Sequence, residues 1–473
     1  MTRHRLRRAH QRTSRIRPQT PLPASPPPTG HRQPPPRMLP ATWSMRQSRS
    51  PPRAASRSAA PRRPRCRASP DGGSRATLFI GRPHGRRGCS LVLHANRQGS
   101  HAGSARIVLR SITPRAPMLE IQTLTDGGQT AGDVAHDVAA FLSAATTSLE
   151  MAFYDLRLDG DAETIVLGAL RAAAARGVKA RIAYNVDHPG PIPVPPPPTC
   201  NPEDVAALGV PARAIAGVPD LMHHKYVIRD GDAVWTGSLN WTNDSWTRQE
   251  NVVVRAGSRD LAYAFTLDFE QLWSTGVVEG SGRVDPRPVE IDGNEVRPWF
   301  TPDHGEDLSH RIAKRLAGSR RRIRIASPVL TSGPILATMA EVAGEGRCDV
   351  AGVVDQTQVD EVFHQWRTNG VSEWKIPLLE AVLQKAPFSG KPSTPWSADG
   401  SVHDFMHAKC VVADDVVFVG SFNLSRSGER NAENVLEIES PAIADQLAAF
   451  VDTIRARYPT ATVPATTVPK VTT

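Results

Sequence analysis

Residues 220–230 read Asp-Leu-Met-His-His-Lys-Tyr-Val-Ile-Arg-Asp, and residues 404–414 read Asp-Phe-Met-His-Ala-Lys-Cys-Val-Val-Ala-Asp. Both stretches contain the spacing His-x-Lys-x4-Asp. Each is followed by Gly-Ser-x-Asn and then by Glu-Asn, at 237–240 and 250–251 in the first copy and at 420–423 and 433–434 in the second. An internal repeat of this kind indicates that the fold is built from two copies of one unit.

The segments before each motif alternate between strand-like and helix-like patterns. In the first copy, strand patterns cover 119–124, 149–153 and 178–186, and helical patterns cover 134–142 and 162–175. The same order returns at 296–300, 312–316, 323–325, 335–342 and 350–354. Because β-α-β-α-β is the order of an α/β layer fold, each copy is predicted to form one such unit.

The repeat places a first half at 118–280 and a second half at 290–460, joined through the Gly/Pro/charge-rich residues 280–297. Residues 461–473 are expected to form a flexible C-terminus. Residues 187–219, with four consecutive prolines at 195–198, are interpreted as a surface loop inserted before the first motif. Residues 356–402 are interpreted as a second insertion, whose Trp366, Trp374 and Trp396 form either an apolar lip for acyl chains or its internal packing.

Composition separates the first 117 residues from the rest. They contain 25 arginines, no lysine and a single acidic residue, Asp71, together with 18 of the 42 prolines. Proline runs at 26–28 and 34–36 cannot continue a helix or a sheet ladder, and low apolar content leaves little surface to bury against chain entropy. The sequence predicts a disordered Arg/Pro-rich tail over 1–117. An equally good interpretation is that the natural product begins at Met118 and the tail is not part of it.

The net charge of the remainder limits the choice of partner. The chain carries +10 overall, but the tail contributes +24, so residues 118–473 carry −14. A nucleic-acid partner normally requires a basic surface, so nucleic acid is an unlikely partner for the folded body. No apolar stretch is long enough to span a bilayer, no signal-peptide pattern opens the chain, and the five cysteines show no paired spacing. These features favour a cytoplasmic protein.

The residue types of the repeat suit phosphoryl transfer. On a strand, alternate residues share a face, so His223 projects with Lys225, and Ser238 with Asn240 on a neighbouring strand; His224 faces the other way and is interpreted as structural. Lysine and asparagine can hold the non-bridging oxygens of a phosphodiester. Of two histidines, one can attack phosphorus and the other can act as acid and base. The lysines supply the positive charge, so no metal and no cofactor is expected.

Both motifs resemble the HKD motif of the phospholipase D superfamily, over essentially all of 118–460. The resemblance implies an α/β fold of two pseudo-two-fold-related α/β/α halves with the active site at their interface. It implies that one histidine is the nucleophile, assigned to His223, that the other is the acid–base group, and that the motif acids are structural. The implied roles are: catalytic His223, Lys225, His407 and Lys409; phosphate-binding and supporting Ser238, Asn240, Ser421 and Asn423; His-orienting Glu250 and Glu433; structural Asp230 and Asp414.

The resemblance implies a phosphodiesterase that removes or exchanges the head group of a glycerophospholipid, giving phosphatidate through a phosphohistidine. The expected partner is a phospholipid at a membrane surface, and one chain holds both motifs, which predicts a monomer. Three alternatives stay open: a nucleic-acid phosphodiesterase on the same scaffold, a phosphatidyl transferase of the cardiolipin-synthase kind, and a binding module with a relic site.

Overall fold

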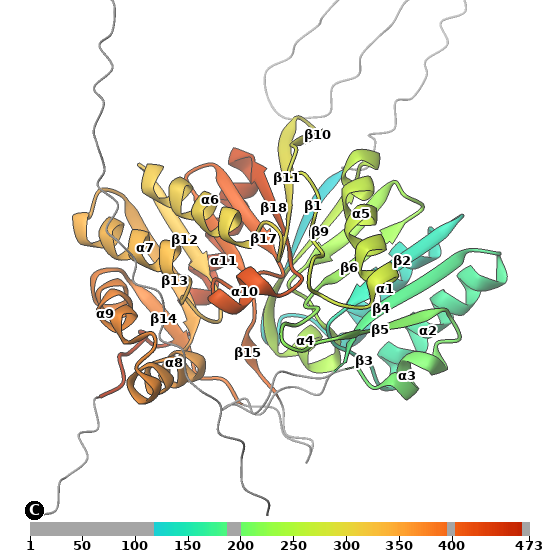
Figure 1. The fold of residues 1–473 in the computed structure, drawn as a ribbon, viewed down its shortest axis with the longest axis horizontal. Helices are drawn as coiled ribbons and strands as arrows, with labels where there is room; N and C mark the ends of the chain where they lie inside the picture. Colours follow the sequence, from blue (N-terminus) through green and yellow to red (C-terminus); the bar gives the residue numbers. More distant parts are fainter. Residues whose placement is uncertain (1–117, 187–199, 395–402, 466–473) are drawn as a thin grey trace, which may run out of the picture. The chain divides into compact units, whose positions relative to one another are not determined.

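The computed structural model describes residues 118–186, 200–394 and 403–465 (Figure 1). The first half contains β1 (Leu119–Leu124), α1 (Ala131–Ser143), β2 (Ser148–Phe153), β3 (Leu156–Arg157), α2 (Gly160–Ala175), β4 (Lys179–Val186), α3 (Pro202–Ala207), β5 (Ala212–Ala216), β6 (Lys225–Arg229), β7 (Ala233–Gly237), β8 (Trp241–Thr242), α4 (Asn243–Thr247), β9 (Gln249–Gly257) and α5 (Arg259–Thr275).

The second half repeats this order. It contains β10 (Val289–Ile291), β11 (Asn294–Phe300), α6 (Gly305–Gly318), β12 (Arg322–Ala326), α7 (Gly333–Glu345), β13 (Asp349–Asp355), α8 (Gln356–Asn369), the 3-10 helix η1 (Glu373–Lys375), α9 (Ile376–Lys385), β14 (Phe388–Lys391), β15 (Phe405–Met406), β16 (Cys410–Ala413), β17 (Val416–Gly420), α10 (Arg426–Arg430), β18 (Asn434–Glu439) and α11 (Pro441–Arg455).

Two mixed sheets with the same topology confirm the predicted duplication. The first has the strand order β1-β9-β7-β6-β2-β4-β5, and the second has β11-β18-β17-β16-β12-β13-β14, with β10 added at the β11 edge. In each sheet three strands run parallel (β2, β4 and β5; β12, β13 and β14). The other strands of the two orders above are antiparallel to their neighbours, and β15 adds a parallel pairing to β9. The fold is therefore α/β with two related halves, as the repeat predicted.

Helices begin where capping residues precede an apolar stripe. Thr130 and Asp133 form a capping box at the start of α1, which buries Val134, Val138 and Phe141 against the sheet. The serines at 258 and 440 cap α5 and α11 in the same way, each accepting from a backbone N–H three residues on. Helices α5 and α11 share one apolar core that contains buried residues of both sheets, so the two halves fold against each other.

The two predicted insertions are largely regular structure, which corrects their interpretation as loops. Residues 356–391 form α8, η1, α9 and the edge strand β14, and residues 202–216 form α3 and the edge strand β5. Trp366 is buried in the core of the second half, so it forms no lip, whereas Trp374 is 58% exposed. Trp396, the prolines at 195–198 and the tail 1–117 lie outside the described residues.

Two further observations concern the chain's ends and its helices. Within the C-terminal segment expected to be flexible, Ala461 N donates to Phe388 O and Thr462 N donates to Gln356 Oε1, both at 2.9 Å. Among the helices of the described residues, none is both long and apolar enough to cross a membrane.

Candidate active site

The two halves exchange short segments at the point where the motifs begin. Strand β15 of the second half pairs in parallel with β9 of the first, with Met406 opposite Glu250. In return, Met222 forms a bridge with Ala432, whose carbonyl accepts from His223 N at 2.9 Å. Each motif histidine directly follows the residue that pairs with the other half. The exchange therefore brings the histidine of one half beside the Glu-Asn pair of the other.

His223 is held by a carboxylate from the second half. Its Nδ1 lies 2.8 Å from Glu433 Oε2, and both side chains are buried. Its ring meets the ring of Tyr154 edge-on at 4.5 Å between centroids. A carboxylate accepts only, so it selects the tautomer with a proton on Nδ1 and leaves Nε2 unprotonated. An unprotonated Nε2 is the form that a nucleophile requires.

His407 is held by an amide. Its Nδ1 lies 3.1 Å from Asn251 Oδ1, which also accepts from Ser238 Oγ at 2.8 Å. Asn251 Nδ2 donates to Ser245 O at 3.1 Å, and this contact fixes the carbonyl end of the amide toward the histidine. His407 thus also carries its proton on Nδ1, but without a negative charge behind it.

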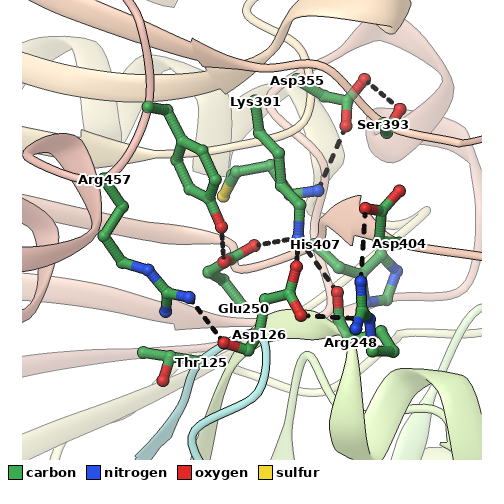
Figure 2. A network of polar contacts seen from close by, with 12 residues as sticks. Thr125, Asp126, Arg248, Glu250, Asp355, Lys391, Ser393, Asp404, His407 and Arg457 are labelled. Atoms are coloured by element: carbon green, nitrogen blue, oxygen red, sulfur yellow. Dashed lines mark hydrogen bonds and ion pairs between the residues drawn. The ribbon is translucent and has the colours of Figure 1, made fainter.

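Glu250 has contacts that the sequence did not predict. The pattern assigned it, with Glu433, to orienting a histidine. In the structure its Oε2 lies 3.1 Å from Lys391 Nζ, and its Oε1 accepts from the hydroxyl of Tyr458. Figure 2 shows Glu250 and Lys391 meeting beside His407. Of the two acids, only Glu433 contacts a histidine among the described residues.

The two motif lysines are buried and make equivalent contacts. Lys225 Nζ donates to His223 O, and Lys409 Nζ donates to His407 O, both at 2.6 Å. The ammonium of Lys225 also lies 4.6 Å from the centre of the Tyr154 ring. Each ammonium has three donors, so the carbonyl contact leaves others for the oxygens of a phosphate group.

Burial and mutual repulsion disfavour positive charge in this cluster. Burial, together with the lysines, lowers the pKa of His223 to about 4 although Glu433 opposes the shift. Burial lowers the pKa of Lys225 to about 7. Burial and neighbouring cations also hold the pKa values of His407 and Lys409 well below their usual ranges. Burial opposes ionisation of Glu433, but His223 and Lys225 hold its pKa below the usual value. Four crowded cation-forming groups favour a bound anion.

The Gly-Ser-x-Asn segments begin with Gly237 and Gly420, the last residues of β7 and β17, and leave the strands at the serines. The sequence had predicted Ser238 and Asn240 on a strand, and that prediction is wrong. Asn240 and Asn423 each have a buried Oδ1 without a hydrogen-bond partner among the described residues. The serine hydroxyls act internally: Ser238 Oγ accepts from Val252 N and Ser421 Oγ accepts from Asn434 N, both at 3.0 Å. The serines therefore fix the strands that carry the Glu-Asn pairs.

The glycine of each Gly-Ser-x-Asn segment is required because the backbone of a neighbouring strand passes close to it. Gly237 has φ +144°, and a Cβ there would collide with the carbonyl of Val252. At the equivalent Gly420 a Cβ would collide with the carbonyl of Asn434. A side chain at either position would push β9 or β18 away from the site.

The motif aspartates act on the backbone. Asp230 accepts from the backbone N–H groups of residues 146–148, and Asp414 accepts from those of residues 320–322, at 2.7–3.0 Å. Both have a left-handed φ, 54° and 55°. Burial opposes ionisation, but these hydrogen bonds hold the pKa of Asp230 and of Asp414 below the usual value. Each aspartate thus fastens a helix-to-strand turn to the motif strand.

Several residues at the site were missed or only partly anticipated. His224 faces away from the cluster, as predicted: its Nδ1 lies 3.2 Å from Asn434 Oδ1 and its Nε2 lies 3.0 Å from Asp268 Oδ2. Asn251 and Asn434 were part of the repeated pattern, but no role was assigned to them. Tyr154 and Lys391 carried no signal in the sequence.

Comparison with known proteins agrees with this geometry. A family model described as "Cardiolipin synthase, PLD-like domain" matches residues 138–273 and 312–455. The chain therefore belongs to the phospholipase D superfamily, as a PLD-like protein with two copies of the motif.

Individual relatives match over shorter stretches or at low identity. Mitochondrial cardiolipin hydrolase from Xenopus tropicalis is 43% identical over 53 residues, and the protein of the same name from Xenopus laevis is 36% identical over 52 residues. Each match covers 11% of this chain and spans 25% of the relative's length. The crystal structure of phosphatidylserine synthase from Haemophilus influenzae Rd KW20 superimposes with a TM-score of 0.50 at 14% identity. It covers 71% of this chain and 86% of that one. The latter likeness shows the fold alone.

Proposed function

We propose that this protein is a phospholipase D-type phosphodiesterase that cleaves the head group from a glycerophospholipid and leaves phosphatidate. The observation that carries the proposal is the buried cluster of two histidines and two lysines, with Glu433 behind His223. A cluster that disfavours its own charges in the absence of an anion is suited to a singly charged phosphodiester.

The first chemical step forms a phosphohistidine. Nε2 of His223 attacks phosphorus while the bond from phosphorus to the head-group oxygen breaks, and the protonated Nε2 of His407 gives its proton to that oxygen. Glu433 stabilises the positive charge that develops on the attacking ring. The ammonium groups of Lys225 and Lys409 hold the non-bridging oxygens.

The second step returns the enzyme to its starting state. His407, now neutral, takes a proton from water as the water oxygen attacks phosphorus and the nitrogen–phosphorus bond breaks. The products are phosphatidate and free His223, and His407 again carries its proton. An alcohol in place of water gives head-group exchange by the same step. Neither step uses a metal.

Phospholipid is favoured as the substrate by the names of the relatives. The two Xenopus proteins are named cardiolipin hydrolases, and the matching family model is described by cardiolipin synthase. Cardiolipin is a phospholipid, so both names refer to phospholipid chemistry. The second of them supports one alternative, transfer of a phosphatidyl group to an alcohol, which shares the first step and differs only in the acceptor.

The test is a side-by-side assay of the full chain in EDTA. Vesicles of phosphatidylcholine, phosphatidylethanolamine and cardiolipin are compared with single- and double-stranded DNA, each with and without glycerol as acceptor. Head-group release without DNA cleavage is the expected result, and a glycerol adduct with no release in the absence of glycerol would identify a transferase. DNA cleavage without head-group release would overturn the substrate. Activity that disappears in EDTA would overturn the two-histidine mechanism.

A further inference from the structure

The contacts of Glu250 differ from those of its counterpart because the strand pairing at the second motif is displaced by one residue. In the first motif, Met222 bridges Ala432, and His223 then contacts Glu433. In the register of the first half, Met406 would pair with Gln249, and His407 would contact Glu250. Instead Met406 pairs with Glu250, and His407 contacts the next residue, Asn251. A feature outside the motifs holds the Glu250 carboxylate in this position.

That feature is Lys391, the buried last residue of β14. Its side chain is 2% exposed, and its Nζ lies 3.1 Å from Glu250 Oε2, 3.2 Å from Asp126 Oδ2 and 3.0 Å from Arg248 O. An ammonium has three donors, and here all three have acceptors. A charge so enclosed fixes the position of its partners, because breaking any contact would leave a buried charge unpaired.

The first half has no counterpart to this lysine. Asn185 at the end of β4 and Asp355 at the end of β13 are equivalent, since they accept from Met222 N and Met406 N respectively. On the neighbouring edge strands, Asn185 is paired with Ile215 and Asp355 with Lys391. An apolar, fully buried Ile215 therefore stands where the second half has its lysine.

Tyr458 supplies a second contact from the same side. Its hydroxyl donates to Glu250 Oε1, and the Lys391 ammonium lies 5.5 Å from the centre of its ring. Counted from the capping serines of α5 and α11, the residue at this place in the first half is Gly276, which has no side chain. Both oxygens of Glu250 are thus held by residues that only the second half contains.

We propose that Lys391 and Tyr458 are positioning residues that keep Glu250 away from the second catalytic histidine. The first histidine then has a carboxylate on Nδ1 and serves as nucleophile, and the second has a neutral amide and serves as proton donor. A ring without a carboxylate behind it gives up its proton more readily, which suits the group that must protonate a leaving oxygen. The assignment of His223 as nucleophile and His407 as proton donor rests on the proposed function. The claim that Lys391 and Tyr458 hold Glu250 away from His407 does not.

A test must take account of the charged groups around Glu250 and around His407. Those around Glu250 are Lys391, Tyr458 and Asp126, with Arg248 and Arg457 on Asp126. Those that act on His407 are Lys409, Lys225, His223 and His403. Only the first group changes when Lys391 is replaced.

The experiment compares Lys391→Met with Lys391→Arg and with the double variant Lys391→Met/Glu250→Gln, all in the full chain. A crystal structure of Lys391→Met is expected to show Glu250 on His407 Nδ1 in place of Asn251. NMR titration of 13C-labelled histidine, with His407→Gln used to assign the resonance, is expected to show the pKa of His407 raised by about 1 unit. The arginine and double variants should return it to the wild-type value.

The matched control is Lys375→Met, because Lys375 is also a buried lysine of the second half but donates to the carbonyl of Thr331. It should leave the His407 titration unchanged. A Glu250 that stays off His407 in Lys391→Met, or a shift that survives in the double variant, would overturn the proposal. If Lys391→Met does not fold, Tyr458→Phe decides the question: a smaller shift in the same direction supports the proposal, and no shift overturns it.

These readouts do not depend on turnover, so failure of the proposed function is seen separately, as a wild-type chain without phosphodiesterase activity. In an active enzyme the basic limb of the kcat/KM profile should move to higher pH with His407, while the acidic limb stays in place. A lysine with a purely structural role would lower stability and move neither limb selectively.

Discussion

His223 and His407 occupy equivalent positions in two sheets of the same strand order, yet one Nδ1 contacts Glu433 and the other contacts Asn251. The motifs themselves differ little, but the strand pairing is displaced by one residue at the second motif, and β14 has Lys391 where β5 has Ile215. Strand pairing and edge strands can therefore give two duplicated histidines different partners.

The halves also differ at the residue after each histidine. His224 lies between Asn434 and Asp268, whereas the second half has Ala408 there. With a histidine at 224, the amide of Asn434 is already engaged; with alanine at 408, the amide of Asn251 is left for His407. The differences at 215/391 and at 224/408 thus accompany the different partners of the two motif histidines.

The largest effect is expected from the histidines. His223→Ala and His407→Ala should each reduce kcat by about 10³-fold or more, and the double variant should lose no more than the worse single one, because the two act as a unit. A substrate with a p-nitrophenolate leaving group needs no protonation, so it should restore the first step in His407→Ala only. The phosphohistidine should then accumulate, because His407 is also the base of the second step. A burst of p-nitrophenolate from the His223 variant instead would reverse the assigned roles. Rapid-mixing kinetics on both substrates measures this.

Replacing the two acids should give unequal losses. Glu433→Gln removes the charge behind the nucleophile and is expected to lower kcat by about 100-fold or more. Glu250→Gln should cost far less activity, because Glu250 touches no catalytic ring. Equal losses measured under the same conditions would show that Glu250 moves onto His407 during turnover. Circular dichroism on each variant checks that the fold is intact.

Anion binding should be coupled to proton uptake. Lys225, with its pKa lowered to about 7, is mostly neutral at pH 8 when the site is empty. A bound phosphate favours the ammonium and raises that pKa, so protons are taken up between pH 7 and the usual lysine range. Titration calorimetry with inorganic phosphate, in two buffers of different ionisation enthalpy, measures the number of protons taken up per phosphate bound. Lys225→Met should reduce the uptake, and binding without uptake would contradict the lowered pKa.

The smallest effect is expected at the motif aspartates. Asn tolerates a left-handed φ, so Asp230→Asn and Asp414→Asn remove the charge and keep the backbone conformation. Each should lower the free energy of unfolding by about 1 kcal/mol, with kcat of the folded protein unchanged. Because their pKa values are depressed, this stability is present above pH 4 and is lost as pH falls further. Urea unfolding at two pH values, beside kcat, separates the two effects.

Much of the fold followed from local patterns. The alternation at 149–153 and the stripe at 134–142 became β2 and α1 because each is a short-range signal of which face is buried. The edge strands were not predicted: β14 has four residues, all buried, and β5 has five. Neither shows the alternation of apolar and polar residues that marks a strand, so both were taken for loops.

The sequence by itself determined that the protein is a duplicated α/β fold of the phospholipase D superfamily and which motif residues recur in both halves. Only the tertiary structure decided which acid serves which histidine. His223 and Glu433 are 210 positions apart, and they meet because the halves exchange strands. Glu250 contacts Lys391 and Tyr458 instead of His407, and nothing local to either motif records those contacts.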